Sequence, residues 1–428
     1  MKEIVVTFNN FELKLTENLY NQVLVKPAFL LLIFFGFYSR TEGFLGLSGG
    51  QLSVLISFGF FALSAFHFLF LRKKYKVSQF TWLITIFFVL SGVIPLVTTF
   101  IFSTEPTRIL RFSIEIGITF FMFFSTYYFV REGVISIKFF LFSLAVLGFL
   151  ASFPLFSNMI GTVNIRRIQG LGGSNYLGSS YAIGAICWVF ILYMTAYREI
   201  TSRKKIAFYF CFFITLMALI LTGTRAAAIA FLVGLAFFQV FGMQSRKFMR
   251  YFFISVGVLI GLMIYLSFQF DLTLLLDRYS YDQLKNMAAI RFDIYARSVT
   301  DLTLIDFLFG RPDFYLFSSG DPGVNPHNVF LAVIRYNGLI PFILFMIIFG
   351  LICFEYLRVY LLHRKEPLYR AAESTIIVLF VMITIYAVFS GGRFTRSFAF
   401  YVIMGYAVGY FELLSRIRSY DDYKKLIL

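Results

Sequence analysis

Charged residues are scarce in this sequence. Only 14% of its 428 residues are charged, whereas 59% are hydrophobic and 21% are aromatic. A soluble globular domain carries about 25% charged residues, so this composition excludes that class. A membrane-spanning helix needs about 20 apolar residues, and runs of that length recur along the whole sequence. The composition therefore predicts an all-α, polytopic integral membrane protein.

Metal-site and nucleotide motifs are also missing. The chain has three cysteines and three histidines. Cys187, Cys211 and Cys353 lie inside apolar runs at unrelated spacing, which predicts small buried side chains rather than a disulfide framework or a metal site. HExxH, CxxC, P-loop and Rossmann glycine motifs are absent from the sequence. We therefore predict no metal and no cofactor.

The formal net charge of +16 raises the question of nucleic acid binding. The basic residues, however, are concentrated in short loops between apolar runs, such as RKKYK (72–76) and REITSRKK (198–205). This distribution is what the positive-inside rule produces in a multi-pass protein. We expect no nucleic acid partner, and we assign these loops to the cytoplasm.

The apolar runs predict about twelve transmembrane helices in a single polytopic domain, residues 1–428. The predicted spans are 20–38, 51–71, 79–102, 109–130, 136–156, 177–197, 206–222, 225–242, 250–270, 327–352, 371–391 and 396–414. Alternation of basic and non-basic loops places both termini in the cytoplasm. No cleavable signal peptide is evident, because the mixed-polar first 25 residues lead directly into a span.

One outer loop, residues 271–326, is much longer than the others. Its first half has apolar residues at roughly helical spacing with charges between them, which predicts one or two short amphipathic helices. Its second half is rich in Gly, Pro, Ser and Asp, as loops with several turns are. Passive connectors are usually shorter, so we favour a lid or a substrate-organising element.

Arginine and lysine are distributed differently between the two predicted faces. Nearly all lysines fall on the cytoplasmic side or near the N-terminus, whereas many arginines fall on the outer side. The planar guanidinium group suits phosphate and carboxylate oxygens, so the outer face is predicted to hold an anion site. Pairing with loop carboxylates is the alternative for any single arginine. The candidates are Arg166, Arg167, Arg225, Arg291, Arg311, Arg335 and Arg393.

The sequence NPHNVF places His327 and Asn328 where this loop meets an apolar run. Asn328 and Arg335 are seven residues apart and share one helix face, with Arg335 about 12 Å deeper by helix rise. An arginine at that depth is costly unless it meets an anion or water, which predicts a polar pocket descending from the outer face. Imidazole is a suitable general base for a hydroxyl, although a capping or interfacial position is the alternative for this pair.

Two further segments add to the predicted anion site. In LTGTRAAAIAFLVG, Arg225 lies in a tight turn followed by alanines that allow close helix packing. A guanidinium held there loses little entropy on gripping a ligand, although an arginine at a membrane boundary can also simply reach towards water. In NIRRIQGLGGSNYLG, Arg166 and Arg167 precede glycines whose amides could line an anion cavity or could serve only turn geometry.

These segments together resemble the O-antigen polymerase and O-antigen ligase superfamily. Its members typically show a Thr/Ser-Gly-x-Arg turn, a long periplasmic loop, His-Asn at the start of a span and a Gly-Leu or Gly-Ile pair beyond it. The corresponding residues here are 223–225, 271–326, 327–328 and 338–339. RRIQGLGGSNYLG is similar to the same superfamily, and the resemblance covers roughly residues 160–345.

The resemblance implies a GT-C-like fold in the bacterial inner membrane and metal-independent glycosyl transfer from undecaprenyl diphosphate on the periplasmic face. Arg225, with the other arginines, would neutralise the leaving diphosphate. His327 would accept the proton of the attacking sugar hydroxyl or hold the diphosphate as imidazolium, and Asn328 would orient sugars. The implied partners are undecaprenyl-diphosphate-linked oligosaccharides and membrane lipids. A chain-length regulator protein and a flippase are further candidate partners.

Three functions remain open on the sequence. A polymerase, which passes the growing glycan onto the next lipid-linked repeat unit, is the first choice. A ligase, which passes the finished glycan to lipid A–core, needs the same arginines. A lipid-linked glycan flippase or other transporter would also fit twelve spans. Transporters are usually built from internal repeats, however, and no repeat is evident in this sequence.

Overall fold

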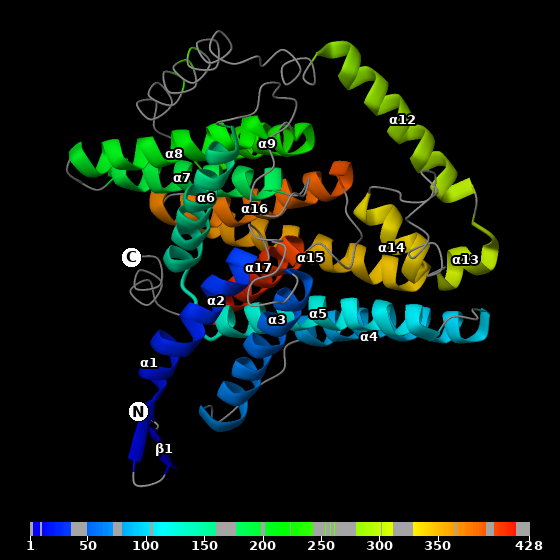
Figure 1. Ribbon diagram of the computed structural model, residues 1–428, viewed down its shortest axis with the longest axis horizontal. Coiled ribbons are helices and arrows are strands. Elements are labelled where there is room, and N and C mark those ends of the chain that lie inside the picture. Colours follow the sequence, from blue (N-terminus) through cyan, green and yellow to red (C-terminus); the bar gives the residue numbers. More distant parts are fainter. Residues whose placement is uncertain are drawn as a thin grey trace.

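The computed structural model describes most of the chain. It covers residues 3–8, 11–35, 49–71, 79–102, 106–159, 177–197, 202–222, 224–242, 253, 257, 261, 280–300, 302–310, 328–363, 366–390 and 398–416. Figure 1 shows long helices that run largely side by side, with a small hairpin at the N-terminal end. The predicted helical architecture is therefore confirmed for the bundle.

The hairpin is an addition to the all-α prediction. Strand β1 (Glu3–Phe8) pairs antiparallel with β2 (Phe11–Thr16), so that Glu3 lies opposite Thr16 and Phe8 opposite Phe11. The segment EIVVTF is rich in β-branched residues, which favour strands. It is too short for a membrane span, and for that reason an analysis based on long apolar runs does not detect it.

The helices follow in chain order. The N-terminal group comprises α1 (Glu17–Tyr20), η1 (Asn21–Val25), α2 (Lys26–Ile33), α3 (Gly49–Phe66), η3 (His67–Leu71), α4 (Gln79–Phe102) and α5 (Pro106–Arg131). The middle group comprises α6 (Ile137–Met159), α7 (Leu177–Tyr197), α8 (Ser202–Leu221) and α9 (Arg225–Phe241). The C-terminal group comprises α12 (Tyr281–Thr300), α13 (Leu304–Phe309), α14 (Val329–Asn337), α15 (Leu339–His363), α16 (Pro367–Ser390) and α17 (Phe398–Arg416).

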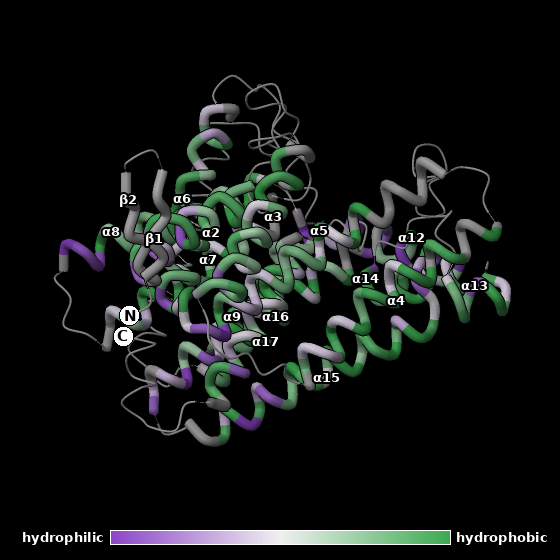
Figure 2. Tube along the Cα trace, turned by 90° about the horizontal axis from the view of Figure 1, so that it is seen from below, coloured by the Kyte–Doolittle hydropathy of each residue, from purple (hydrophilic) through white to green (hydrophobic). Residues whose placement is uncertain are grey.

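Within the part of the chain that the structure describes, four helices are long and apolar enough to cross a membrane, through Ile137–Ser157, Arg203–Leu221, Leu339–Leu361 and Tyr369–Val388. Several shorter apolar helices accompany them. In Figure 2, α15 is hydrophobic along most of its length, whereas the start of α8 is hydrophilic. The chain is thus a helical multi-pass membrane protein. The count of twelve spans stays a prediction, and most of the predicted span 250–270 lies outside the described residues.

Two glycines of α17 set its close packing on α5. A Cβ added to Gly405 would lie 2.6 Å from the carbonyl oxygen of Phe123, and one added to Gly409 would lie 2.6 Å from that of Tyr127. Glycines four residues apart share a helix face and let two backbones approach closely. This contact fixes the core of the bundle between α5 and α17.

The predicted span 327–352 is wrong in one respect, because it consists of two helices. The chain breaks at Gly338, whose φ is +90°, a conformation that favours glycine. Gly310, after α13, has φ +78°, and a Cβ there would lie 2.5 Å from the carbonyl oxygen of Tyr336. A Cβ on Gly338 would in turn collide with the carbonyl oxygen of Leu308. The ends of α13 and α14 therefore meet backbone to backbone, and the candidate span begins at Leu339.

Candidate functional site

The described candidates from the sequence converge on one helix, α12. Arg291 lies on it, and Arg225, Asn328 and Arg335 each contact it from other parts of the chain. The remaining candidates lie outside the described residues; they are Arg166, Arg167, Arg311, His327 and Arg393. In Figure 1, α12 lies at the edge of the molecule, outside the long helices.

The sequence of α12 explains its placement. Ser280 precedes the helix, and its Oγ accepts a bond from the Gln283 amide at 3.4 Å, as residues at helix N-termini do. Arg291, Tyr295 and Ser298 lie on one side of the helix and are partly or fully buried. Asp293 and Arg297 are exposed and form an i,i+4 ion pair at 2.9 Å. Amphipathic spacing of this kind holds a helix against a protein surface by one face.

Arg225 is the first residue of α9 and contacts the first turn of α12. Its Nη1 donates to the carbonyl oxygen of Gln283 at 3.0 Å. The alanines that follow, Ala226 and Ala227, are buried where α9 packs against α7 and α16. The guanidinium is therefore carried on a well-packed helix. It also lies at the positive end of the α9 dipole, which adds to the local positive potential.

Tyr295 joins Arg291 to Asn328. Its hydroxyl donates to the carbonyl oxygen of Val388 in α16 at 2.8 Å, and the side chains of Arg291 and Asn328 lie within hydrogen-bonding reach of its oxygen. Asn328 is the N-cap of α14, and its Oδ1 accepts bonds from the Phe330 and Leu331 amides at 2.9 and 3.3 Å. The capping role considered for Asn328 is thus observed, and its amide nitrogen remains directed towards Tyr295.

The environment of Tyr295 keeps its hydroxyl protonated. Burial raises the pKa of this phenol, while the charge of Arg291 and the hydrogen bonds from Asn328 and Arg291 lower it. Burial dominates, so the pKa lies above its usual range. At neutral pH the site therefore presents a neutral hydroxyl beside a guanidinium. Sequence reasoning did not single out Tyr295, although its spacing of four from Arg291 places both on one helix face.

Arg335 is enclosed by protein. It is 1% exposed, and its Nη1 donates to the carbonyl oxygen of Ser298 near the end of α12 at 2.8 Å. Two residues later, the Nδ2 of Asn337 donates to the carbonyl oxygen of Ser91 in α4 at 2.8 Å. Helix α14 is thus fastened to α12 on one side and to α4 on the other. These contacts favour a positioning role for Arg335, and its predicted contact with substrate stays a prediction.

A comparison with protein-family models adds the deciding observation. The model of the O-antigen ligase family matches residues 210–346. The match covers about a third of the chain and supports the resemblance to the O-antigen polymerase and ligase superfamily. The matched segment contains α9, α12, α13 and α14, together with Arg225, Arg291, Asn328 and Arg335. No match was found among curated proteins. The resemblance predicted from the sequence is therefore confirmed.

Within the residues that the structure describes, no three or more His, Cys, Asp or Glu side chains gather where they could hold a metal ion. The candidate site is instead built from arginine, tyrosine, asparagine and main-chain carbonyl groups. Such groups bind and orient an anionic or hydroxylated ligand by charge and hydrogen bonding.

Replacing Arg335 by methionine is expected to loosen α12. The change keeps most of the side-chain volume but removes the charged hydrogen bond to Ser298, which is worth about 1.5–3 kcal/mol. We expect a lower thermal midpoint and faster amide hydrogen exchange across residues 281–300. Arg297→Met, in which the replaced arginine is 62% exposed, is the control and should change stability by no more than about 0.5 kcal/mol. Unchanged exchange in Arg335→Met would show that Ser298 needs no such anchor.

Proposed function

We propose that this protein is an O-antigen or related surface-polysaccharide polymerase. In this proposal it joins undecaprenyl-diphosphate-linked repeat units on the periplasmic face of the bacterial inner membrane, with both termini in the cytoplasm. The observation that carries the proposal is the convergence of Arg225, Arg291 and Asn328 on α12 within the segment matched by the O-antigen ligase family. Guanidinium groups suit a diphosphate, and the neutral side chains of Tyr295 and Asn328 beside Arg291 suit a sugar.

The proposed reaction is a glycosyl transfer by displacement. A hydroxyl of the acceptor sugar attacks the anomeric carbon of the donor, and a new carbon–oxygen bond forms. The bond from that carbon to the diphosphate breaks, so undecaprenyl diphosphate leaves with the electron pair. Attack opposite the leaving group would invert the anomeric configuration.

The residues divide the work in this proposal. Arg225 and Arg291 neutralise the negative charge that grows on the departing diphosphate, which is useful mainly in the transition state. His327, which directly precedes Asn328 in the chain, accepts the proton of the attacking hydroxyl. Tyr295 and Asn328 orient the sugars. The other arginines, Arg166, Arg167, Arg311 and Arg393, remain candidates for binding the lipid-linked glycan.

A ligase is the second candidate, because the matching family model is described as O-antigen ligase. The donor chemistry and the arginines would be the same. The acceptor would be lipid A–core instead of a second lipid-linked repeat unit, and a chain-length regulator protein would be a partner of the polymerase rather than of the ligase. The nature of the product therefore separates the two functions.

Deletion of the gene, followed by restoration, tests the proposal. Surface glycan is extracted and resolved on a gel, with the restored strain as the control. We expect the ladder to be lost, leaving core with a single repeat unit. Bare core with long chains retained on undecaprenyl diphosphate would establish the ligase instead. An unchanged ladder would contradict both functions.

A further inference from the structure

Helices α3, α4 and α5, with the adjoining η3, form an apolar pocket that the proposed function does not use. Its volume is about 410 Å³. Six aromatic side chains make most of its wall, namely Phe61, Phe68, Trp82, Phe120, Phe124 and Tyr128. A concave, mostly apolar site of this size is what small hydrophobic ligands and lipid chains occupy.

The hydroxyl groups in the wall are turned to bonds within the protein. The Oγ of Ser64 donates to the carbonyl oxygen of Phe61 at 2.7 Å, and the Oγ1 of Thr85 donates to that of Thr81 at 2.8 Å. The hydroxyl of Tyr128 lies 2.9 Å from Nδ1 of His67. Because the protein already engages these groups, the pocket presents a hydrocarbon surface to its occupant.

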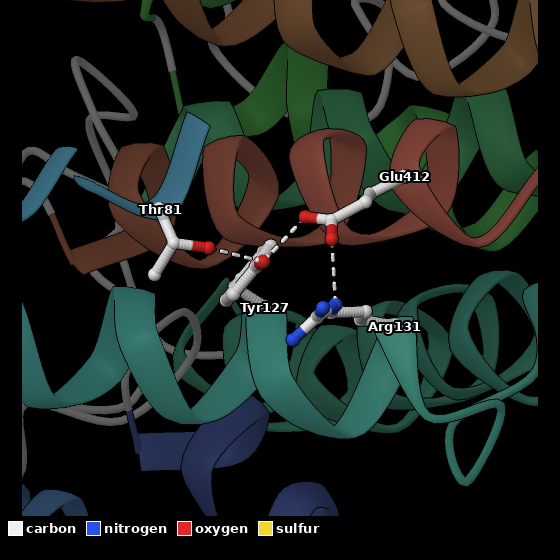
Figure 3. A network of polar contacts seen from close by, with 4 residues as sticks. All are labelled: Thr81, Tyr127, Arg131 and Glu412. Carbon is white, nitrogen blue, oxygen red and sulfur yellow. Dashed lines mark hydrogen bonds and ion pairs between the residues drawn. The ribbon is translucent and has the colours of Figure 1, made fainter. Parts of the chain in front are cut away.

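A polar network behind the pocket fixes one part of its wall. Figure 3 shows the hydroxyl of Thr81, which lines the pocket, bonded to the hydroxyl of Tyr127. Tyr127 donates to Glu412 of α17, and Glu412 pairs with Nε of Arg131 at 2.7 Å. Contacts between α4, α5 and α17 therefore hold the Thr81 side of the pocket in place.

The pocket continues the apolar outer surface of the protein. Trp82 and Phe68 line it and are 59% and 40% exposed. Phe58, Leu69 and Ile86, which lie within four residues of lining residues on α3, η3 and α4, are also large hydrophobic residues with exposed side chains. The lining residues all fall within the apolar stretches Val54–Phe70, Phe80–Ile94 and Ile116–Arg131. In a multi-pass membrane protein such exposed apolar side chains face lipid, so lipid hydrocarbon is what reaches this pocket.

We propose that this pocket binds one acyl chain of a membrane phospholipid as a specific site. The acyl chain lies against the aromatic wall and fills the void between α3, α4 and α5, where it adds dispersion contacts to the lining side chains. The site is separate from the residues that converge on α12. Its occupancy can therefore be tested whatever glycan reaction the protein catalyses.

The two tryptophans provide the test. Trp82 lines the pocket, whereas Trp188 is 2% exposed inside the bundle. In the Trp188→Phe variant, Trp82 is the sole tryptophan, so excitation at the red edge of the absorption band reports on it alone. The purified full-length protein in detergent is titrated with phosphatidylethanolamine brominated in its acyl chains, since bromine quenches tryptophan on contact. We expect quenching that saturates, and we expect excess unbrominated phosphatidylethanolamine to reverse it.

A matched pair of variants locates the lipid acyl chain. Ala65 lines the pocket, and Ala62 lies three residues earlier on α3 and is exposed. Added to Trp188→Phe, Ala65→Phe should fill the pocket and weaken saturable quenching by roughly tenfold or more. Ala62→Phe adds the same ring to the lipid-facing side and should leave that quenching unchanged.

Three results would overturn the proposal. Quenching of the parent that rises in proportion to brominated lipid, without saturation or competition, would show lipid coating the surface only. Equal saturable quenching in Ala65→Phe and Ala62→Phe would show that the acyl chain binds outside this pocket. Displacement by undecaprenyl phosphate but not by unbrominated phosphatidylethanolamine would show a polyprenyl site. If Ala65→Phe does not fold, the competition experiment on the parent decides alone.

Discussion

Alanine at position 225 is expected to reduce glycan transfer by about 10²–10³-fold, the range observed when one donor to a developing oxyanion is removed. Arg225 is the first residue of α9, is partly exposed and lies beside the first turn of α12. The guanidinium group can therefore contact a diphosphate while the backbone of α9 stays packed in the bundle. Alanine is the best helix former, so α9 should remain intact.

The measurement is polymer formation by reconstituted protein supplied with lipid-linked repeat units. Arg225→Lys keeps the charge but loses the planar fork, so its activity should lie between those of the parent and Arg225→Ala. Arg297→Ala is the matched control, because Arg297 is an exposed arginine of α12 paired with Asp293. It should retain full activity. Full activity of Arg225→Ala in the same assay would remove Arg225 from the mechanism.

Removal of the Glu412 carboxylate is expected to destabilise the bundle by about 3–5 kcal/mol, the range for breaking a buried ion pair from one side. Arg131 is 2% exposed and pairs with Glu412 at 2.7 Å, and Tyr127 donates to the other carboxylate oxygen. Figure 3 shows both groups directed at this one side chain. Glu412→Ala takes away their shared acceptor and the carboxylate charge that pairs with the buried guanidinium.

Thermal unfolding in detergent measures this effect. Glu355→Ala is the control, because Glu355 pairs with Arg358 at the same distance of 2.7 Å but with side chains 27% and 46% exposed. That pair should be worth about 0–1 kcal/mol. Replacing both partners, as in Arg131→Met with Glu412→Leu, should restore much of the lost stability. Apolar side chains of similar volume often replace a buried ion pair at no cost. Equal midpoints for Glu412→Ala and Glu355→Ala would show that burial adds nothing to the pair.

The positions of the long helices follow closely from hydropathy. The predicted segments 79–102 and 177–197 coincide with α4 and α7. Each segment is an apolar run bounded by polar or charged residues. In a membrane such a run forms a helix, because a helix satisfies all of its backbone hydrogen bonds internally. The break at Gly338 is different in kind. It lies within one apolar run and depends on the contact with α13, which no local pattern encodes.

The candidate site shows the same division. Residue type and spacing were enough to single out Arg225, Arg291 and Arg335. Their observed acceptors include the main-chain carbonyl groups of Gln283 and Ser298, and every residue carries such a group, so the sequence could not indicate them. Arg335 was predicted to line an open polar pocket because its charge was considered without its partner. The three-dimensional arrangement supplies that partner from another helix.

The paired glycines at the ends of α13 and α14 affect how well the chain tolerates insertions. The chain departs after Gly310, which touches the last residues of α14, and returns at Asn328, the N-cap of the same helix. The sequence inserted between these two points, residues 311–327, therefore joins ends about 13 Å apart by helix rise. Lengthening such an insert is inexpensive, at about 0.6 kcal/mol for each doubling. Insertions between residues 310 and 328 are thus expected to leave α13, α14 and the helices that hold the arginines in place.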